Sequence, residues 1–195
     1  MLRGGEHPKF LIFLILAPIL WGGNFVVGSV MANDLPGHWT NFLRWVIALV
    51  VLAPFCLPAV WQHRALLLRH WKRLAVTALL GVTLFNTVLY IALQTATVSI
   101  AAVAFAVTPF MISGLQALIH RELPSARFVG GAAIALMGMA LAQWEALHSG
   151  TPFLGVALVL VAALIWSGFC VSLKQFSVPV PCHASFFSQI AIGTV

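Results

Sequence analysis

The chain alternates between long apolar runs and short polar gaps. Six of the runs come close to the roughly 20 residues that a helix needs to cross the hydrocarbon core of a membrane. A seventh apolar run begins near Cys182 and continues to Val195. The pattern therefore predicts six membrane-spanning helices and the start of a seventh. The six predicted spans cover residues 10–31, 38–61, 74–94, 98–119, 128–144 and 153–176.

Basic residues are concentrated in alternate gaps. Nine of the ten Lys and Arg residues precede the first span, follow the second or fourth span, or end the sixth, and the tenth, Arg44, lies inside the second span. The gaps 32–37, 95–97 and 145–152 contain no Lys or Arg. Because positively charged loops are retained in the cytoplasm, this asymmetry predicts an inner-membrane protein with a cytoplasmic N-terminus.

An internal repeat indicates the architecture. Residues 17–50 align without gaps on residues 162–195, and nine of the 34 pairs are identical, among them Trp21 with Trp166. Because five spans separate the two copies, the second copy enters the membrane from the opposite side. We therefore predict an all-α, polytopic transmembrane helix bundle of inverted five-helix repeats, the second of them incomplete. The predicted domains are a first repeat at 10–144 and the start of a second at 153–195.

The composition supports a membrane protein. Hydrophobic residues make up 62% of the chain and charged residues only 7%, which is too few to hydrate the surface of a soluble domain of this size. The net charge of +6 does not indicate a nucleic-acid partner, because the basic residues lie in short gaps and form no continuous face. The expected surroundings are therefore a lipid bilayer.

The sequence has no signature of an enzyme or of a cofactor site. Its three cysteines are far apart without CxxC spacing, and its seven histidines are scattered, so no metal site is expected. It contains neither a glycine-rich phosphate loop of the Walker type nor a pairing of nucleophile and base. We expect neither catalysis nor a bound cofactor.

Polar side chains inside the predicted spans are candidates for contact with a solute. Asn24 lies near the middle of the first span, where hydrogen bonding between helices and contact with a substrate explain it equally well. Asn86, Tyr90 and Gln94 are spaced at i, i+4 and i+8, which places them on one face of the third span. That stripe predicts either structural hydrogen bonds or the lining of a pathway.

Arg44 is a charged residue well inside a predicted span. A charge in a bilayer is costly, so Arg44 is expected to face the bundle interior or an aqueous cavity, where it would contact an anion or carboxylate. The alternative is that its long side chain extends to the outer interface and pairs with Asp34. Its equivalent in the repeat is Gln189.

Two spans carry residues that interrupt helices. The first contains Pro18 and three glycines, which predicts either a small-residue packing face or a kink that lines a cavity. The fourth contains Thr108 followed by Pro109, which predicts a kink there.

Short segments in a characteristic order carry a resemblance to a known family. The chain resembles the EamA-type transporters of the drug/metabolite transporter superfamily. The resemblance covers nearly the whole chain. The segments that carry it are Leu20–Phe25, Pro36, Arg44–Trp45, Asn86–Leu93, Thr108–Phe110, Arg121–Leu123 and the glycines Gly130, Gly131 and Gly138.

The resemblance implies ten helices in two inverted halves around a central cavity that opens to each side in turn. Members of the family export or exchange amino acids, metabolites, nucleotide sugars or drugs. By similarity the cavity is lined from the first, third and fourth spans, with one residue from the second half. The implied cavity residues are Trp21, Asn24, Asn86, Tyr90, Gln94 and Trp166.

Together these observations predict a secondary transporter of a small metabolite, such as an amino acid or a drug-like compound, that works by alternating access. The alternative is a truncated or half-unit membrane protein without transport activity of its own. The expected partners are a small-molecule substrate and the bilayer, with no nucleic acid. A homo-oligomer and a missing C-terminal half both stay open as further partners.

Overall fold

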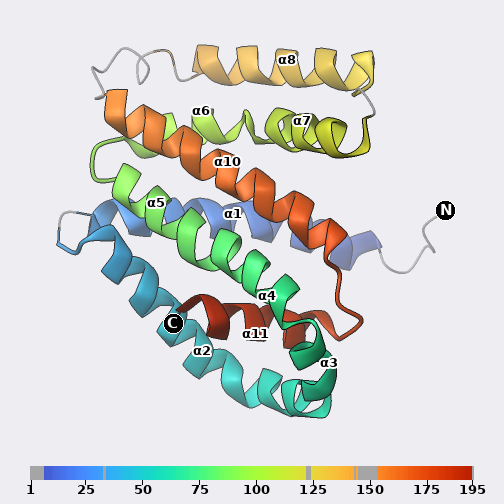
Figure 1. Cartoon of the computed structure of the whole chain (residues 1–195). Helices are drawn as coiled ribbons and strands as arrows, with labels where there is room; N and C mark the ends of the chain where they lie inside the picture. The colour runs from blue at the N-terminus through green and yellow to red at the C-terminus, as the bar shows by residue number, and fades with distance from the viewer. Residues whose placement is uncertain (1–6, 33, 122–123, 143, 145–152, 195) are drawn as a thin grey trace.

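The computed structural model describes residues 7–32, 34–121, 124–142, 144 and 153–194, and over these residues the fold is all-α (Figure 1). The helices are α1 (His7–Met31), α2 (Gly37–Gln62), α3 (Arg64–Arg69), α4 (Trp71–Ala78), η1 (Leu79–Leu84), α5 (Phe85–Ala92), α6 (Val98–Phe105), α7 (Thr108–His120), α8 (Ala126–Ala142), α10 (Phe153–Gln175) and α11 (Cys182–Thr194).

The predicted polytopic helix bundle is confirmed. Five helical stretches of the described chain are long and apolar enough to cross a membrane. They are α1, α2, the continuous helix α4–η1–α5, the pair α6–α7, and α10. Helix α8, which corresponds to the predicted fifth span, is a shorter apolar helix of 17 residues. Helix α11 corresponds to the seventh apolar run and has 13 residues in the described chain.

Successive helices run back and forth across the molecule. In Figure 1 the end of α1, the start of α2 and the link between α5 and α6 lie at the left, whereas α3, the end of α7 and the end of α10 lie at the right. All basic residues of the described chain beyond position 60 belong to segments at the right-hand end. These residues are Arg64, Arg69, Lys72, Arg73, Arg121, Arg127 and Lys174. The basic segments thus lie at one end of the bundle, as the basic residues in alternate gaps of the sequence predict. Asp34 lies at the opposite end.

Helix α10 lies at the centre of the bundle. It contacts α4, η1, α5, α6 and α7, while α11 packs against α2, α4 and η1. Much of the core where α5, α6 and α10 meet is alanine, and Ala92, Ala101 and Ala162 are fully buried. Small side chains let helix backbones approach closely, and close packing is the main attraction between helices inside a lipid bilayer. This alanine core fixes the helices that carry the site.

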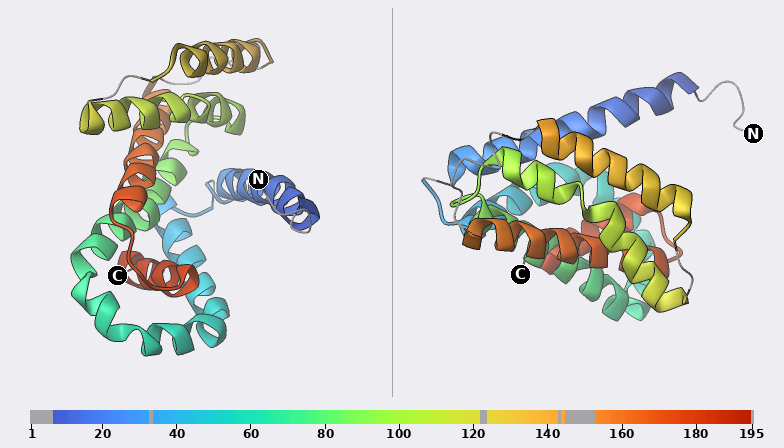
Figure 2. Two further views of the ribbon diagram at one scale, coloured as in Figure 1. Left: turned by 90° about the vertical axis from the view of Figure 1, so that its right-hand side faces the viewer. Right: turned by 90° about the horizontal axis from the view of Figure 1, so that it is seen from above.

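Helices α1 and α8 lie at the periphery. Figure 2 shows α1 standing apart from the helices of the core, and α8 forms an outer layer against α6 and α7. Large apolar side chains of α1 are exposed along its length, for example Leu20 at 71% and Val30 at 65%. Apolar side chains on the outside of a membrane-spanning helix contact lipid tails, so this exposure fits a bilayer.

Helices α2 and α5 approach each other closely at Gly37, the first residue of α2. A Cβ atom at Gly37 would lie 2.7 Å from the backbone nitrogen of Ile91. Gly28 of α1 likewise packs on the ring of Tyr90. Glycine at these positions lets α1 and α2 converge on α5, and the cavity described below lies at this convergence.

Candidate functional site

A cavity of about 380 Å³ lies where α1, α2, the η1–α5 segment, α10 and α11 meet. Its volume falls within the range of small-molecule sites in proteins. Five of the seven residues predicted as cavity candidates line it, namely Trp21, Asn24, Arg44, Asn86 and Trp166. The remaining lining comes from aromatic, aliphatic and small residues, with one further polar side chain, that of Gln189.

Arg44 projects from α2 into this cavity. Its Nη2 donates a 2.7 Å hydrogen bond to Oδ1 of Asn86, and its guanidinium carbon lies 4.1 Å from the ring centroid of Trp45 and 5.6 Å from that of Tyr90. Its Nε is buried and has no hydrogen-bond partner among the described residues. In the structure Arg44 therefore contacts the third span, and the alternative pairing with Asp34 is not adopted.

A π-helical segment, η1, supplies the backbone groups that hold this network. In a π-helix the backbone hydrogen bonds span five residues, so the turn is wider than in an α-helix. The carbonyl of Val82 accepts bonds from Asn41 Nδ2 at 3.1 Å and from Trp45 Nε1 at 3.2 Å. Asn86 Nδ2 donates to the carbonyl of Gly81 at 2.8 Å. These bonds fix Asn86, which in turn positions the guanidinium of Arg44.

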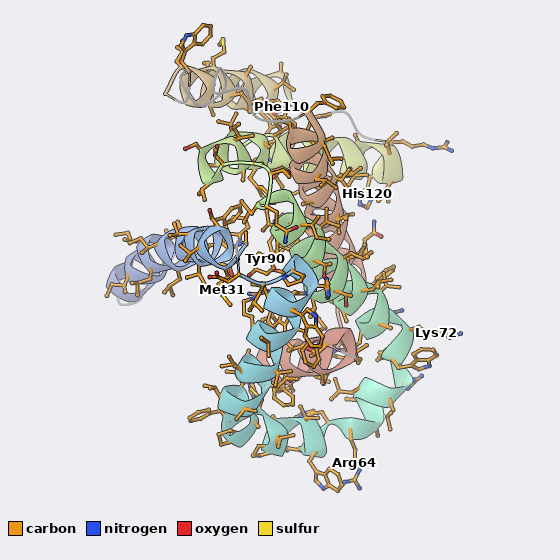
Figure 3. All side chains as sticks on the ribbon, turned by 90° about the vertical axis from the view of Figure 1, so that its left-hand side faces the viewer. Met31, Arg64, Lys72, Tyr90, Phe110 and His120 are labelled. Atoms are coloured by element: carbon orange, nitrogen blue, oxygen red, sulfur yellow. The ribbon has the colours of Figure 1, made fainter. Side chains whose placement is uncertain are left out.

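Tyr90 lies beside the cavity, between α1 and α5 (Figure 3). It is almost fully buried, and its hydroxyl donates a 2.7 Å hydrogen bond to Oδ1 of Asn24. No hydrogen bond joins the side-chain nitrogen of Asn24 to another described residue, so its amide donor is free toward the cavity. The Asn24–Tyr90 bond thus connects α1 to α5, and Asn24 of this pair also lines the cavity.

Gln94 does not join the other candidates. Helix α5 ends at Ala92, and Gln94 lies in the following turn, where it is exposed and outside the cavity. The predicted i, i+4, i+8 stripe assumes an unbroken α-helix through residue 94. Because α5 ends at Ala92, only Asn86 and Tyr90 of the three belong to the network.

Aromatic rings form the apolar wall of the cavity. The centroid of Trp166 lies 5.4 Å from that of Trp21, 4.7 Å from that of Phe85 and 5.1 Å from that of Phe169. Trp21 comes from α1, Phe85 from α5, and the other two from α10. The rings thus tie together helices from both predicted repeats.

A second cavity, of about 640 Å³, lies between α1, α6, α7, the start of α8 and α10. Trp21 and Trp166 line this cavity as well as the first one. It adjoins the predicted interruption of the fourth span, where α6 ends at Phe105 and α7 begins at Thr108. Pro109 has no N–H to donate back along the helix, and the buried hydroxyl of Thr108 has no hydrogen-bond partner among the described residues. The expected kink is therefore confirmed as a break.

Sequence reasoning missed several side chains that complete the site. Asn41 lies three residues before Arg44, so helical spacing places it on nearly the same face of α2. Gln189 could have been predicted from the internal repeat, since it is the equivalent of Arg44. Phe169 and Phe186 are aromatic residues in apolar runs and carry no distinguishing local signal. The π-turn of η1 likewise has no marker in the hydrophobic pattern.

The described residues contain no cluster of His, Cys, Asp or Glu able to hold a metal ion. Arg3, Glu145 and His148, which entered the charge and metal arguments, lie outside the described residues. The site is therefore built from one cation, neutral amides and aromatic rings.

The chain was compared with protein families, curated proteins and solved structures. The EamA-like transporter family matches residues 8–144, which includes every predicted cavity residue except Trp166. No curated protein and no solved structure gave a match.

Proposed function

Because the chain belongs to the EamA-like transporter family and is a multi-pass membrane protein, we propose that it carries a small organic solute across the bilayer by alternating access. The observation that carries the proposal is the position of Arg44. Its guanidinium faces a cavity of about 380 Å³ at the meeting point of five helical segments. Charged residues inside a membrane domain commonly mark the path of a substrate or an ion.

The predicted inverted repeats at 10–144 and 153–195 support this mechanism. Under the 145-residue offset Trp21 is equivalent to Trp166, and these two rings contact each other. Helices α2 and α11, which are also equivalent under that offset, pack against each other. Contacts between equivalent elements are expected near a pseudo-two-fold axis, where transporters with inverted repeats bind their substrates.

The two cavities suggest how access alternates. Trp21 and Trp166 line both of them, so this ring pair separates the 380 Å³ cavity from the 640 Å³ cavity. In our proposal the pair parts when α1 moves relative to α10, which joins the two cavities and lets a solute pass. The peripheral position of α1 favours such a movement.

For orientation we propose an inner-membrane protein whose N-terminus and α3 lie in the cytoplasm. Single cysteines at Asp34 and at Arg69, in a background without native cysteines, test this with an impermeant thiol reagent applied to spheroplasts. The cysteine at position 34 should react from outside, and the one at position 69 only after the membrane is opened. Labelling of both from the same side would contradict the five-span unit.

Exchange in proteoliposomes tests the function. The full chain is reconstituted, the vesicles are loaded with amino acids, organic acids or amines, and entry of the labelled solute is followed. Trp166→Ala should reduce exchange strongly, while Trp71→Ala, at an exposed ring outside both cavities, should not. Absence of exchange for every solute class, from a correctly inserted protein, would instead support the alternative of a half-unit without transport activity.

A further inference from the structure

The described lining of the 380 Å³ cavity carries a positive charge and no negative one. Arg44 is the one ionisable side chain among the described residues that line it. The whole chain has four acidic residues, Glu6, Asp34, Glu122 and Glu145, and all of them lie outside the apolar spans. The spans of this chain therefore contain no carboxylate that neutralises Arg44.

An uncompensated guanidinium inside a membrane domain calls for a counter-charge. Arginine keeps its proton in proteins, so Arg44 cannot become neutral as a buried lysine or histidine can. Asn86 offers only the dipole of an amide oxygen, and the rings of Trp45 and Tyr90 offer only their faces. A bound anion would compensate this charge through the part of the guanidinium that faces the cavity.

Arg44 and Asn24 offer hydrogen-bond donors to a ligand, while Gln189 keeps its side-chain oxygen as an acceptor. Both polar atoms of the Asn86 side chain are already hydrogen-bonded, because its oxygen accepts from Arg44 and its nitrogen donates to the carbonyl of Gly81. Asn24 accepts from Tyr90 and keeps its amide nitrogen for a ligand. A ligand that fits Arg44 and Asn24 together must therefore accept hydrogen bonds, as a carboxylate does.

The other wall of the cavity is aromatic. The ring of Trp166 contacts three other rings, with centroid separations between 4.7 and 5.4 Å. These are the rings of Trp21, Phe85 and Phe169. Such a wall favours a flat apolar body, which gains both burial and ring–ring contact. Charge at one wall and rings at the other describe an amphipathic ligand.

We propose that this cavity selects aromatic monocarboxylates, with the carboxylate on Arg44 and Asn24 and the aromatic body against Trp21 and Trp166. The proposal rests on the transport function above and names the substrate class of that same site. The proposed site also favours simple acids over amino acids. The α-ammonium group of an amino acid would lie near the positive charge of Arg44, and the described lining of the cavity has no carboxylate to pair with it.

Four ligands that share a phenyl ring on a two-carbon chain test the charge preference. Hydrocinnamate is an acid, phenylalanine adds an ammonium group, hydrocinnamamide is neutral and phenethylamine is a cation. Equilibrium dialysis of radiolabelled hydrocinnamate against the full chain in nanodiscs, with the other three as competitors, ranks their affinities. Hydrocinnamate should bind best, at least about tenfold more tightly than phenylalanine. Equal or better binding of phenethylamine or of the neutral amide would overturn the proposal.

Substitutions at the charged wall sharpen the test. Arg44→Gln should weaken hydrocinnamate binding about 10- to 100-fold, the range expected for a lost hydrogen bond to a charged group. Arg64→Gln is the matched control, because Arg64 also lies over a tryptophan, with 4.4 Å to the ring centroid of Trp61. Arg64 does not line the cavity and lies far from Tyr90 (Figure 3). Unchanged binding in Arg44→Gln would overturn the proposal.

A variant that adds a negative charge covers the case in which Arg44→Gln does not fold. Asn24→Asp places a carboxylate in the same cavity, so it should weaken hydrocinnamate binding and strengthen that of phenethylamine. An unaltered ranking in this variant would count against the site. The two proposals also fail separately: exchange of amines that is insensitive to Arg44 would leave transport intact and reject the anion preference, whereas loss of all exchange would reject transport.

Discussion

The close approach of α2 to α5 at Gly37 makes one prediction quantitative. In Gly37→Ala the new Cβ would lie 2.7 Å from the backbone nitrogen of Ile91, and ordinary contact begins at 3.4 Å, so the helices must separate locally by about 0.7 Å. Overpacking of this kind costs about 1–3 kcal/mol. Alanine regains part of the helix propensity that glycine lacks, so we expect a net loss of about 1–2 kcal/mol in the free energy of unfolding.

The same movement should reach the site. The bond from Arg44 to Asn86 measures 2.7 Å, and a separation of about 0.7 Å brings it near the limit of a useful hydrogen bond. Gly37→Ala should therefore also weaken hydrocinnamate binding, although Gly37 does not line the cavity. Stability is measured by reversible unfolding in mixed micelles, followed by tryptophan fluorescence, and binding by equilibrium dialysis.

Gly131→Ala is the matched control for this reasoning. Gly131 lies in α8 with no described atom within 4 Å of an added Cβ, so alanine there should be neutral or stabilise by up to about 1 kcal/mol. If Gly37→Ala proved as stable as the parent chain, or if both variants lost the same stability, the close contact between α2 and α5 would not exist as described.

Three further outcomes follow from the polar network and the cysteines. Asn41→Ala should lower the unfolding free energy by about 1–3 kcal/mol in the same micelle assay, because it removes the bonds from the buried Asn41 amide to the carbonyl of Val82 and to the hydroxyl of Thr87. Tyr90→Phe removes only the bond to Asn24 and should cost less, about 0.5–1.5 kcal/mol, so a larger loss than for Asn41→Ala would argue against the network. A soluble maleimide followed by mass spectrometry should modify Cys182, which is exposed, while Cys56, which is buried in α2, should react only after denaturation. Prompt labelling of Cys56 in the native protein would contradict its place in the packing.

The positions of the helices could be predicted because membrane spans leave a strong signal. An apolar run bounded by charged or proline-containing gaps has few alternatives in a bilayer, and the predicted 38–61 became α2 at Gly37–Gln62. The predicted 153–176 became α10 at Phe153–Gln175 for the same reason. The break before Thr108 was also predictable, since proline removes a backbone donor wherever it occurs inside a helix.

The partners within the site were less accessible to sequence reasoning. Arg44 could extend to Asp34 or turn inward, and only the packing of α2 on the third span decides between them. Gln94 lies apart from the other candidates because the periodicity argument assumes an α-helix through residue 94, whereas α5 ends at Ala92. The internal repeat identifies Trp21 and Trp166 as equivalent residues, but it does not predict that their rings are in contact.

The π-turn of η1 has a consequence for how this helix can change by mutation. A π-turn holds one residue more than the α-helical turn it replaces, so it is the trace that a single-residue insertion leaves in a helix. Deleting one residue from Leu79–Leu84 would turn this wide turn into an ordinary α-helical turn, so the helix on its two sides would keep nearly the same orientation. Asn86 and Tyr90 would then still face Arg44 and Asn24. A deletion in the regular α-helix Phe85–Ala92 removes no surplus residue and would rotate one part of the helix by about 100° against the other. Single-codon deletions should therefore be tolerated better within Leu79–Leu84 than within Phe85–Ala92.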